Sequence, residues 1–304
     1  MLKKTIDENP GFVIVGAGKI AHSLTPALID AGFILKAVIS ENIESAMSLA
    51  QKYNCTAFYD KVNDIPSDAD LIVLSVPDSQ IKNVINKLVS AKVNLRNKLV
   101  IHLSGSKSID SLIRLKLIGA EIGSIHIMQT FPDKLRIDVD GCYAAIESDN
   151  NNVRDFLFGL AVKLKMLPFD IKSEAKIYYH LMGVFASNFT IANFYNSDKC
   201  RDKFSWNMPG TAQLLIPIVE KTLSNISGNG ISEALSGPVK RGDLETIQEH
   251  ITALKKDKLM LVHYLSASLT LLESARKTSS IQEEKYTRIK KYLTTELKSA
   301  AAEM

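Results

Sequence analysis

From residue 12 to about 172 the chain alternates short apolar runs with stretches of helical periodicity. This alternation is typical of a parallel sheet covered by helices on both faces, because a crossover helix must connect neighbouring parallel strands. The apolar runs predict strands at 12–15, 34–39, 56–59, 71–76, 99–102, 122–128, 143–146 and 168–171, and the helical stretches end near 32, 53, 91, 117 and 164. The pattern predicts an α/β domain with a doubly wound parallel sheet.

Beyond Lys172 the alternation typical of strands disappears and long helical patterns replace it. The first predicted helix runs from Glu174 to about Tyr195 and is apolar on nearly all sides after Leu181, as expected for a helix surrounded by others. Further helices are predicted at 212–225, 244–254, 259–275 and 281–298. We therefore expect two domains, an α/β domain over 1–172 and an all-α C-terminal domain over 173–304.

The first predicted strand breaks into the sequence Gly16-Ala17-Gly18-Lys19-Ile20-Ala21. Between a strand and a helix, this G-x-G-x-x-A pattern favours a dinucleotide-binding loop of the Rossmann type. Gly16 permits the tight turn, Gly18 lets a phosphate approach bare backbone, and Ala21 lets the helix pack on the strand. The N–H groups and the positive dipole end of the helix then face the pyrophosphate. The alternative is a simple turn in an α/β sheet.

The choice between NAD and NADP depends on the end of the second predicted strand. An acidic residue at that point would bond both ribose hydroxyls and select NAD. The chain has Ser40 there, which is small and neutral and leaves room for a 2′-phosphate, followed by Glu41. Glu41 either bonds the ribose or is a solvated residue of the next helix. We expect NADP as the cofactor, with NAD as the alternative.

Other strand ends carry polar residues, and ligands of open parallel sheets bind beyond the carboxyl ends of the strands. His102 ends one strand and is expected to be structural. His126 lies within another and either faces substrate or needs a partner inside the fold. For Ser104 and Gly105, lining a nicotinamide pocket competes with a simple turn. The residues predicted to lie near the nicotinamide are Val76, Pro77, Asp78, Ser104 and Gly105.

Polar residues interrupt the first helix of the predicted second domain. Regular helical geometry places Ser187 nearly in line with His180, and Gly183 leaves a notch on the same face. His180 suits proton transfer to a carbonyl because the unperturbed imidazole pKa is about 6.5. Asn188 borders the notch, and Arg241 can clamp a carboxylate or phosphate. The predicted catalytic residues are His180, Asn188 and Arg241; the alternatives are a core histidine, an asparagine that bridges helices, and an arginine paired with Asp243.

Composition removes several classes of function. The net charge of +4, from 37 basic and 33 acidic residues, is too small and scattered for nucleic-acid binding. Cys55, Cys142 and Cys200 lie too far apart for a recognisable zinc site or redox pair. The sequence contains no apolar segment typical of a signal peptide or a membrane span. We therefore expect a cytoplasmic protein with no metal and with neither nucleic acid nor membrane as a partner.

Taken together and in order, these motifs resemble a bacterial group in which a Rossmann-like, NADP-oxidoreductase-type domain precedes a helical domain of unknown function. That group is related to pyrroline-5-carboxylate reductases and deazaflavin-dependent NADP reductases. Two departures from its pattern are Ile127 after His126, where proline is expected, and Glu41 after Ser40, where arginine is usual. The resemblance covers residues 10–275 and rests on Gly16-Ala17-Gly18, Ser75-Val76-Pro77-Asp78, His102-Leu103-Ser104-Gly105, Gly123-Ser124-Ile125-His126 with Gln129-Thr130-Phe131, Tyr179-His180 with Ser187-Asn188-Phe189, and Ser236-Gly237-Pro238 with Arg241-Gly242-Asp243.

The resemblance implies a dinucleotide-binding oxidoreductase that is a homodimer through the helical domain. We expect hydride transfer between the nicotinamide and a small carbonyl or imine substrate in the cleft between the domains. The alternative is a non-catalytic dinucleotide-binding sensor of redox state or metabolites. A methyltransferase is disfavoured because the second strand does not end in an acidic residue. A β-hydroxyacid dehydrogenase is disfavoured because the central helix lacks a lysine followed four residues on by asparagine.

Overall fold

The computed structural model describes residues 9–204 and 208–304. The chain divides into two compact units, and the boundary between them in the sequence lies between Phe189 and Thr190. The predicted domain boundary at 172/173 adjoins the 3₁₀ turn Ser173–Ala175 inside the first unit, and it stays a prediction. Each unit is described by itself below.

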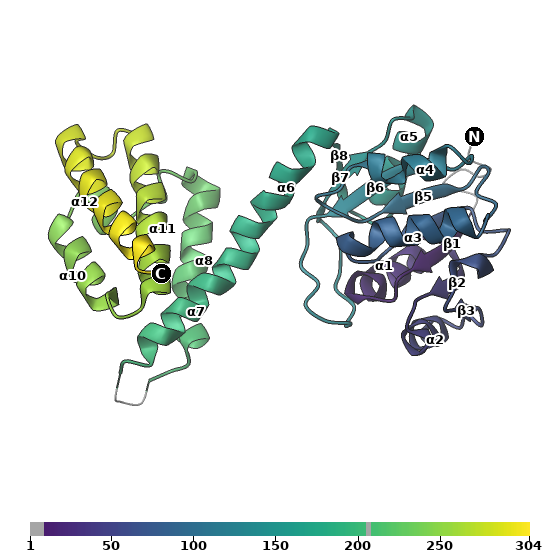
Figure 1. Cartoon of the computed structure of the whole chain (residues 1–304), viewed down its shortest axis with the longest axis horizontal. Coiled ribbons are helices and arrows are strands. Elements are labelled where there is room, and N and C mark those ends of the chain that lie inside the picture. Colours follow the sequence, from purple (N-terminus) through teal and green to yellow (C-terminus); the bar gives the residue numbers. More distant parts are fainter. Residues whose placement is uncertain (1–8, 205–207) are drawn as a thin grey trace. The chain divides into compact units, whose positions relative to one another are not determined.

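Unit 1 is built on one eight-stranded sheet in the order β3-β2-β1-β4-β5-β6-β7-β8 (Figure 1). This order is doubly wound, since the chain moves outward from β1 to β3 and then returns to add β4 on the other side of β1. The α/β fold class is therefore confirmed. The strands are β1 (Gly11–Val15), β2 (Ile34–Ile39), β3 (Phe58–Tyr59), β4 (Leu71–Leu74), β5 (Leu99–His102), β6 (Glu121–Ile127), β7 (Tyr143–Glu147) and β8 (Leu167–Asp170).

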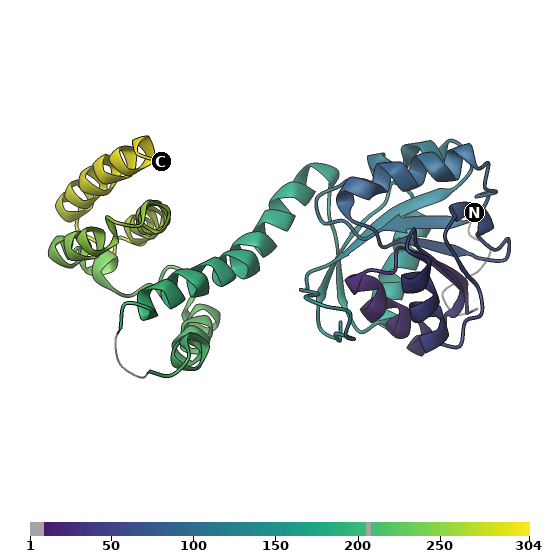
Figure 2. The same cartoon turned by 60° about the horizontal axis from the view of Figure 1, so that its bottom comes forward.

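Helices cover both faces of this sheet (Figure 2). Phe12 and Ile14 of β1 pack in one core with α1, α2 and α5, whereas Val13 and Val15 pack in another with α3. Period-2 alternation places successive side chains in opposite cores, as expected for an inner strand buried on both faces. The helices are α1 (Lys19–Asp30), α2 (Ile43–Lys52), α3 (Asp78–Ser90), α4 (Ile113–Lys116) and α5 (Asn151–Lys163), with 3₁₀ turns at Val62–Asp64 and Ile109–Leu112.

One strand pair departs from the parallel arrangement expected from the sequence. β7 pairs antiparallel with β6, whereas the other neighbouring pairs are parallel. The physical reason is the connection: residues 128–142 form an irregular segment, hereafter the β6–β7 loop, with no crossover helix. Without a crossover the chain cannot return to the starting end of β6, so β7 runs back alongside it.

The long helix predicted from Glu174 is present but is not uniform. It consists of α6 (Lys176–Gly183), a π-helical turn (Val184–Asn188) and α7 (Phe189–Arg201). A π-helical turn holds more residues per turn than an α-helix, so the regular helical geometry that placed Ser187 in line with His180 does not hold through Val184–Asn188. Such turns occur often at functional sites.

Unit 2 is helical, as predicted. Its core lies between α9, α10, α11 and α12, with Ile247, Leu265 and Ile289 fully buried. Exposed apolar side chains gather instead on α7 and α8, among them Ile191, Tyr195 and Ile218. In the ranges that the structure describes, no helix combines the length and apolar character needed to span a bilayer. The remaining helices are α8 (Thr211–Asn229), α9 (Pro238–Arg241), α10 (Leu244–Leu254), α11 (Lys258–Lys277) and α12 (Glu283–Ala302).

Candidate active site

The two glycines between β1 and α1 are present for different reasons. Gly16 has a φ of +103°, and a Cβ there would lie 2.3 Å from the carbonyl oxygen of Ser75, so the fold itself requires glycine. At Gly18 the backbone is extended, and a Cβ would lie 3.8 Å from that oxygen, at ordinary van der Waals distance. Packing in the described part of the chain therefore does not demand glycine at position 18.

The start of α1 has the properties of an anion-binding helix end. Within residues 9–204 no side chain caps the helix at Gly18, and its first turn contains no acidic residue. The first N–H groups of a helix lack internal partners and carry partial positive charge. A glycine that nothing in the fold requires leaves space for a phosphate against these groups. The residues present therefore fit the pyrophosphate of a dinucleotide.

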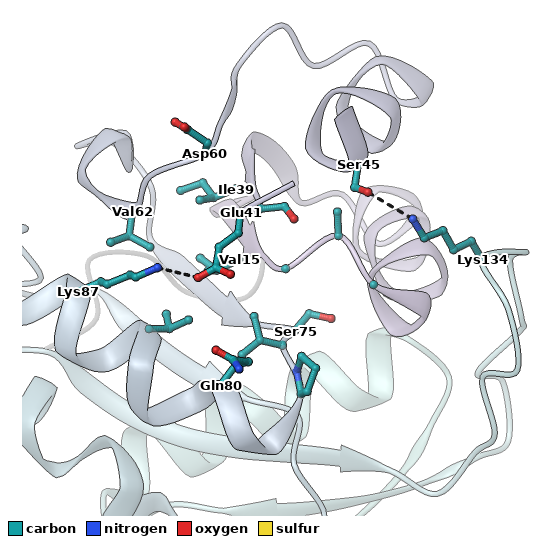
Figure 3. Close-up of a pocket in the computed structure, with 17 residues that line it drawn as sticks. Val15, Ile39, Glu41, Ser45, Asp60, Val62, Ser75, Gln80, Lys87 and Lys134 are labelled. Carbon is teal, nitrogen blue, oxygen red and sulfur yellow. Dashed lines mark hydrogen bonds and ion pairs between the residues drawn. The ribbon is translucent and has the colours of Figure 1, made fainter. Parts of the chain in front are cut away.

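A cavity of about 310 Å³ opens beside this turn (Figure 3). Figure 3 shows Glu41 pointing toward Lys87, and the Lys87 Nζ lies 2.6 Å from the Glu41 Oε1. On another wall the Lys134 Nζ donates to the Ser45 Oγ at 3.4 Å. Sequence reasoning assigned neither lysine to the site, because α3 and the β6–β7 loop bring them there from distant positions. The predicted cofactor residues in this lining are Gly16, Ala17, Gly18, Ser40, Glu41, Val76 and Pro77.

A second cavity, of about 490 Å³, shares part of this lining. Gly18, Ser75, Val76 and Pro77 border both cavities, so the two meet where α1 begins and β4 ends. Phe131 of the β6–β7 loop forms part of the second wall. The predicted cofactor residues in the second lining are Gly18, Lys19, Ile20, Val76, Pro77, Asp78 and Ser104.

Asp78, the first residue of α3, accepts hydrogen bonds from two serines that follow β5. The Oγ atoms of Ser104 and Ser106 each donate to the Asp78 Oδ2 at 2.7 Å. Partial burial would raise the pKa of Asp78, but the two hydroxyl groups, together with nearby His102 and His180, hold this pKa below its usual value. Ser104 Oγ also accepts from the Lys107 N–H at 2.9 Å. Ser104 therefore shapes the turn and lines the cavity at the same time.

His102 is fully buried at the end of β5, and both of its ring nitrogens have partners. The Ser104 N–H donates to Nδ1 at 3.2 Å, so Nε2–H is assigned as the donor to the Ser108 carbonyl at 3.3 Å. Burial lowers the pKa of His102 to about 4, and nearby Lys176 adds to this effect. The ring is neutral at pH 7 and its contacts fit the structural interpretation.

His126 has a different environment, because its Nδ1 is buried with no hydrogen-bond partner among the described residues. Its ring centroid lies 5.4 Å from that of Tyr179 and 6.1 Å from that of His180. Burial lowers the pKa of His126 to about 4, with a smaller contribution from His180. A Cβ at Gly105 would lie 2.6 Å from the His126 Nε2, so this ring is a packing reason for glycine at position 105. Gly105 lines neither cavity described above.

His126 and His180 border a third cavity, of about 350 Å³, in unit 1. Gly183, Ser187 and Asn188 line it as well, so α6 and the π-helical turn bring together the polar residues singled out in the sequence. A neutral imidazole nitrogen, a hydroxyl and a carboxamide supply both donors and acceptors for a small polar ligand.

A buried ion pair fixes the start of α6 to the sheet. Lys176 is 1 % exposed, and its Nζ lies 3.1 Å from the Glu147 Oε2 and donates to the Ser124 Oγ at 2.6 Å. Glu147 also accepts from the Ser173 Oγ at 2.5 Å and the Ile109 N–H at 3.1 Å. Burial lowers the pKa of Lys176, although Glu147 opposes this by favouring the charged form. Sequence reasoning missed this pair; the signal was polar Ser124 within an apolar strand.

Arg241 belongs to unit 2, and its side chain is 64 % exposed and lies 3.7 Å from the Asp243 Oδ2. Asp243 caps α10 by accepting from the Thr246 N–H at 3.2 Å. The predicted catalytic role of Arg241 stays a prediction. Within the described ranges, no three His, Cys, Asp or Glu side chains are placed to hold a metal ion.

Two families match successive parts of the chain. Residues 11–105 match the family described as NADP oxidoreductase, coenzyme F420-dependent, and residues 142–270 match a domain of unknown function, DUF2520. The predicted resemblance is thus confirmed: an NADP-oxidoreductase-type domain precedes a C-terminal domain of unknown function. A search among curated proteins found no match.

Solved structures carry the same arrangement. A Bacteroides fragilis protein described as a "putative NADP oxidoreductase" is 26% identical, with a TM-score of 0.74 over 87% of this chain and 98% of its own. A Thermotoga maritima protein is also 26% identical, with a TM-score of 0.66 over 88% and 99%. The Plasmodium falciparum pyrroline carboxylate reductase with NADP bound is 14% identical, with a TM-score of 0.56 over 93% and 98%, and shows the fold alone.

Proposed function

We propose that this chain is an NADP-dependent oxidoreductase that transfers a hydride between the nicotinamide and a small carbonyl or imine substrate. The observation that carries the proposal is Gly18, a glycine that packing does not require, at an uncapped helix start where two cavities meet. The family match over residues 11–105 supports an NADP oxidoreductase.

In this proposal the dinucleotide extends across both cavities. Its pyrophosphate lies against Gly16–Ile20, its adenosine half lies toward Ser40 and Glu41, and its nicotinamide half lies toward Pro77 and Ser104. The cofactor, when bound, gives or accepts the hydride. The residues of the chain bind the cofactor, exclude water from it and transfer the proton to or from the substrate.

The substrate is proposed to occupy the third cavity, beside His180. His180 gives or takes the proton of the carbonyl or imine, since its ring borders this cavity and an imidazole nitrogen can act as a general acid or base. Asn188 orients the reacting group by a hydrogen bond, and the His126 ring borders the same cavity.

The substitution Gly18→Ala tests the cofactor site. The Cβ fits the protein, so we expect the free energy of unfolding to stay within about 1 kcal/mol of the wild-type value. The same Cβ occupies the position of the phosphate, so NADPH should bind at least tenfold more weakly in a titration followed by nicotinamide fluorescence.

Gly228→Ala is the matched control, since a Cβ at this position of α8 would meet no atom within 4 Å and should leave NADPH binding unchanged. Equal NADPH affinity in Gly18→Ala and the wild type would refute the site. If the wild type binds NADPH tightly but turns over no keto acid, aldehyde or imine in a broad screen, the sensor alternative replaces the oxidoreductase.

His180→Ala tests the proton-transfer role with a substrate from that screen. Removing a general acid or base lowers kcat by about 10²- to 10⁴-fold. We expect this loss with an unchanged melting temperature. His250→Ala is the control, because His250 contacts Tyr264 within unit 2 and should leave kcat unaltered. A falling melting temperature with unchanged kcat would assign His180 to the core instead.

We further propose that a second copy of the chain covers the exposed apolar side chains of α7 and α8. Ile191 is 70 % exposed, and Ile218 is 63 % exposed. Apolar groups gathered in this way mark association surfaces more often than free surface. Analytical ultracentrifugation should give the mass of a dimer at micromolar concentration, and a monomer at that concentration would refute the proposal.

A further inference from the structure

The β6–β7 loop runs beside α1 (Figure 1) and contacts this helix through several residues, although most of its side chains are exposed. The Ile137 N–H donates to the Ser23 Oγ at 2.9 Å, and the Arg136 guanidinium lies 2.7 Å from the Asp30 carboxylate. Val139 is 3 % exposed and belongs to the core that contains α1 and α2. These contacts hold the loop over the first strand–helix unit at several points.

The same loop contributes to the walls of the first and second cavities. Phe131 borders the second cavity together with Pro77 and Ser104, and Lys134, three residues on, borders the first together with Ser40. A ligand contact made at Lys134 therefore acts on the segment that forms the wall at Phe131.

The charged side chains that line the first cavity are Glu41, Asp60, Lys87 and Lys134, and of the two lysines Lys134 is the one not paired with a carboxylate among the described residues. Lys87 is engaged by Glu41, which neutralises the carboxylate nearest to the end of β2. Lys134 donates to the neutral Ser45 hydroxyl, and within the described ranges no carboxylate lies at ion-pair distance from it. Ser45 is in the first turn of α2, where the Asn42 Oδ1 already accepts from its N–H at 2.8 Å and Glu44 adds a negative charge, so the Ser45 hydroxyl and Lys134 are the groups that this wall offers.

Lys134 also acts on a buried histidine of α1. His22 of α1 is 7 % exposed, and its pKa lies below the usual value, chiefly because of burial and then because of Lys134 and Lys52. A cation and a hydroxyl group, Lys134 and Ser45, thus lie together on one wall of the first cavity. This combination recognises a phosphate dianion better than a neutral hydroxyl.

We propose that Lys134, together with Ser45, binds the 2′-phosphate of NADP, and that the β6–β7 loop links recognition of this phosphate to the cavity wall at Phe131. The inference rests on the proposed function. Lys134, which the β6–β7 loop brings from the other half of the sheet, takes the place of the arginine that the sequence lacks after Ser40. Lys87 pairs with Glu41 and so weakens the repulsion between this carboxylate and the phosphate.

Lys134→Gln in the full-length chain tests the inference by binding alone. A hydrogen bond to a charged group contributes about tenfold to a hundredfold in affinity, so the dissociation constant for NADPH should rise by that factor. The constant for NADH, which lacks the phosphate, should change less than about twofold. The fragment adenosine 2′,5′-bisphosphate should lose affinity in parallel with NADPH.

Lys36→Gln is the matched control, since it removes the same charge from a lysine that pairs with Asp68 and lines neither cavity. It should leave both dissociation constants unchanged. If Lys134→Gln weakens NADPH and NADH equally, or neither, the inference fails and the proposed function stands. If the wild type binds neither dinucleotide, both fail together.

Hydrogen–deuterium exchange tests the link to Phe131. NADPH should slow exchange over residues 129–139 of the wild type, and NADH should slow it less. The difference between the two cofactors should vanish in Lys134→Gln. Equal protection of the loop by both cofactors in the wild type would overturn the proposed link.

Discussion

Replacing Lys176 by methionine is expected to lower the free energy of unfolding by about 3–5 kcal/mol. The methionine fills most of the space but leaves the Glu147 carboxylate buried, 5 % exposed, without its cation. The hydroxyls of Ser124 and Ser173 remain, yet neutral donors compensate a buried charge only in part. Urea unfolding followed by circular dichroism measures the loss.

Lys116→Met provides the comparison, since Lys116 pairs with Asp149 at the surface. An exposed pair contributes about 0–1 kcal/mol, so the same substitution there should have little effect. Adding Glu147→Gln to Lys176→Met should restore part of the lost stability by removing the stranded charge. A loss below about 1 kcal/mol in Lys176→Met would mean that the buried pair does not hold α6 to the sheet.

Acidification from pH 7 to pH 4 should destabilise unit 1 by several kcal/mol. Burial lowers the pKa values of His102 and His126 to about 4 in the folded chain, whereas an unfolded histidine titrates near 6.5. Between pH 6.5 and pH 4 these histidines bind protons in the unfolded chain but not in the folded chain, so the free energy of unfolding falls as the pH falls. Each histidine contributes a slope of about 1.4 kcal/mol per pH unit, and the contribution levels off below pH 4.

His126→Phe isolates one part of this dependence. The substitution removes one titrating group but keeps a ring against Gly105, so the slope of stability between pH 6.5 and 4 should fall by about half. Unfolding curves at closely spaced pH values give both slopes. A wild-type stability that stays flat between pH 7 and 5 would contradict the neutral, buried state of both histidines.

Local pattern predicted the fold well, for physical reasons. The apolar runs that became β1, β2 and β5 are long enough to identify inner strands, and Gly16 requires a conformation that other residues avoid. The reversal of β7 was missed because the sheet direction of a strand depends on its connection, which has no periodicity of its own.

The candidate site was predictable only where sequence neighbours stay neighbours in space. The turn at Gly16 and Gly18 and the pair His180 and Asn188 meet this condition. Lys87, Lys134 and Lys176 belong to no local motif that distinguishes them from other lysines of the chain. Their partners lie far away along the chain, so only the tertiary fold could reveal them.

Because β7 is reversed, the connection between β6 and β7 is an irregular loop whose length can change. A crossover helix at this point would be rigid, with its backbone hydrogen bonds closed internally and its length set by the sheet that it covers. An irregular segment has no such constraint, so a residue inserted or deleted between Gln129 and Lys134 would alter how far the lysine extends while the strand ladders on either side stay in register. In the proposal above, the length of this segment therefore sets where Lys134 lies relative to the first cavity.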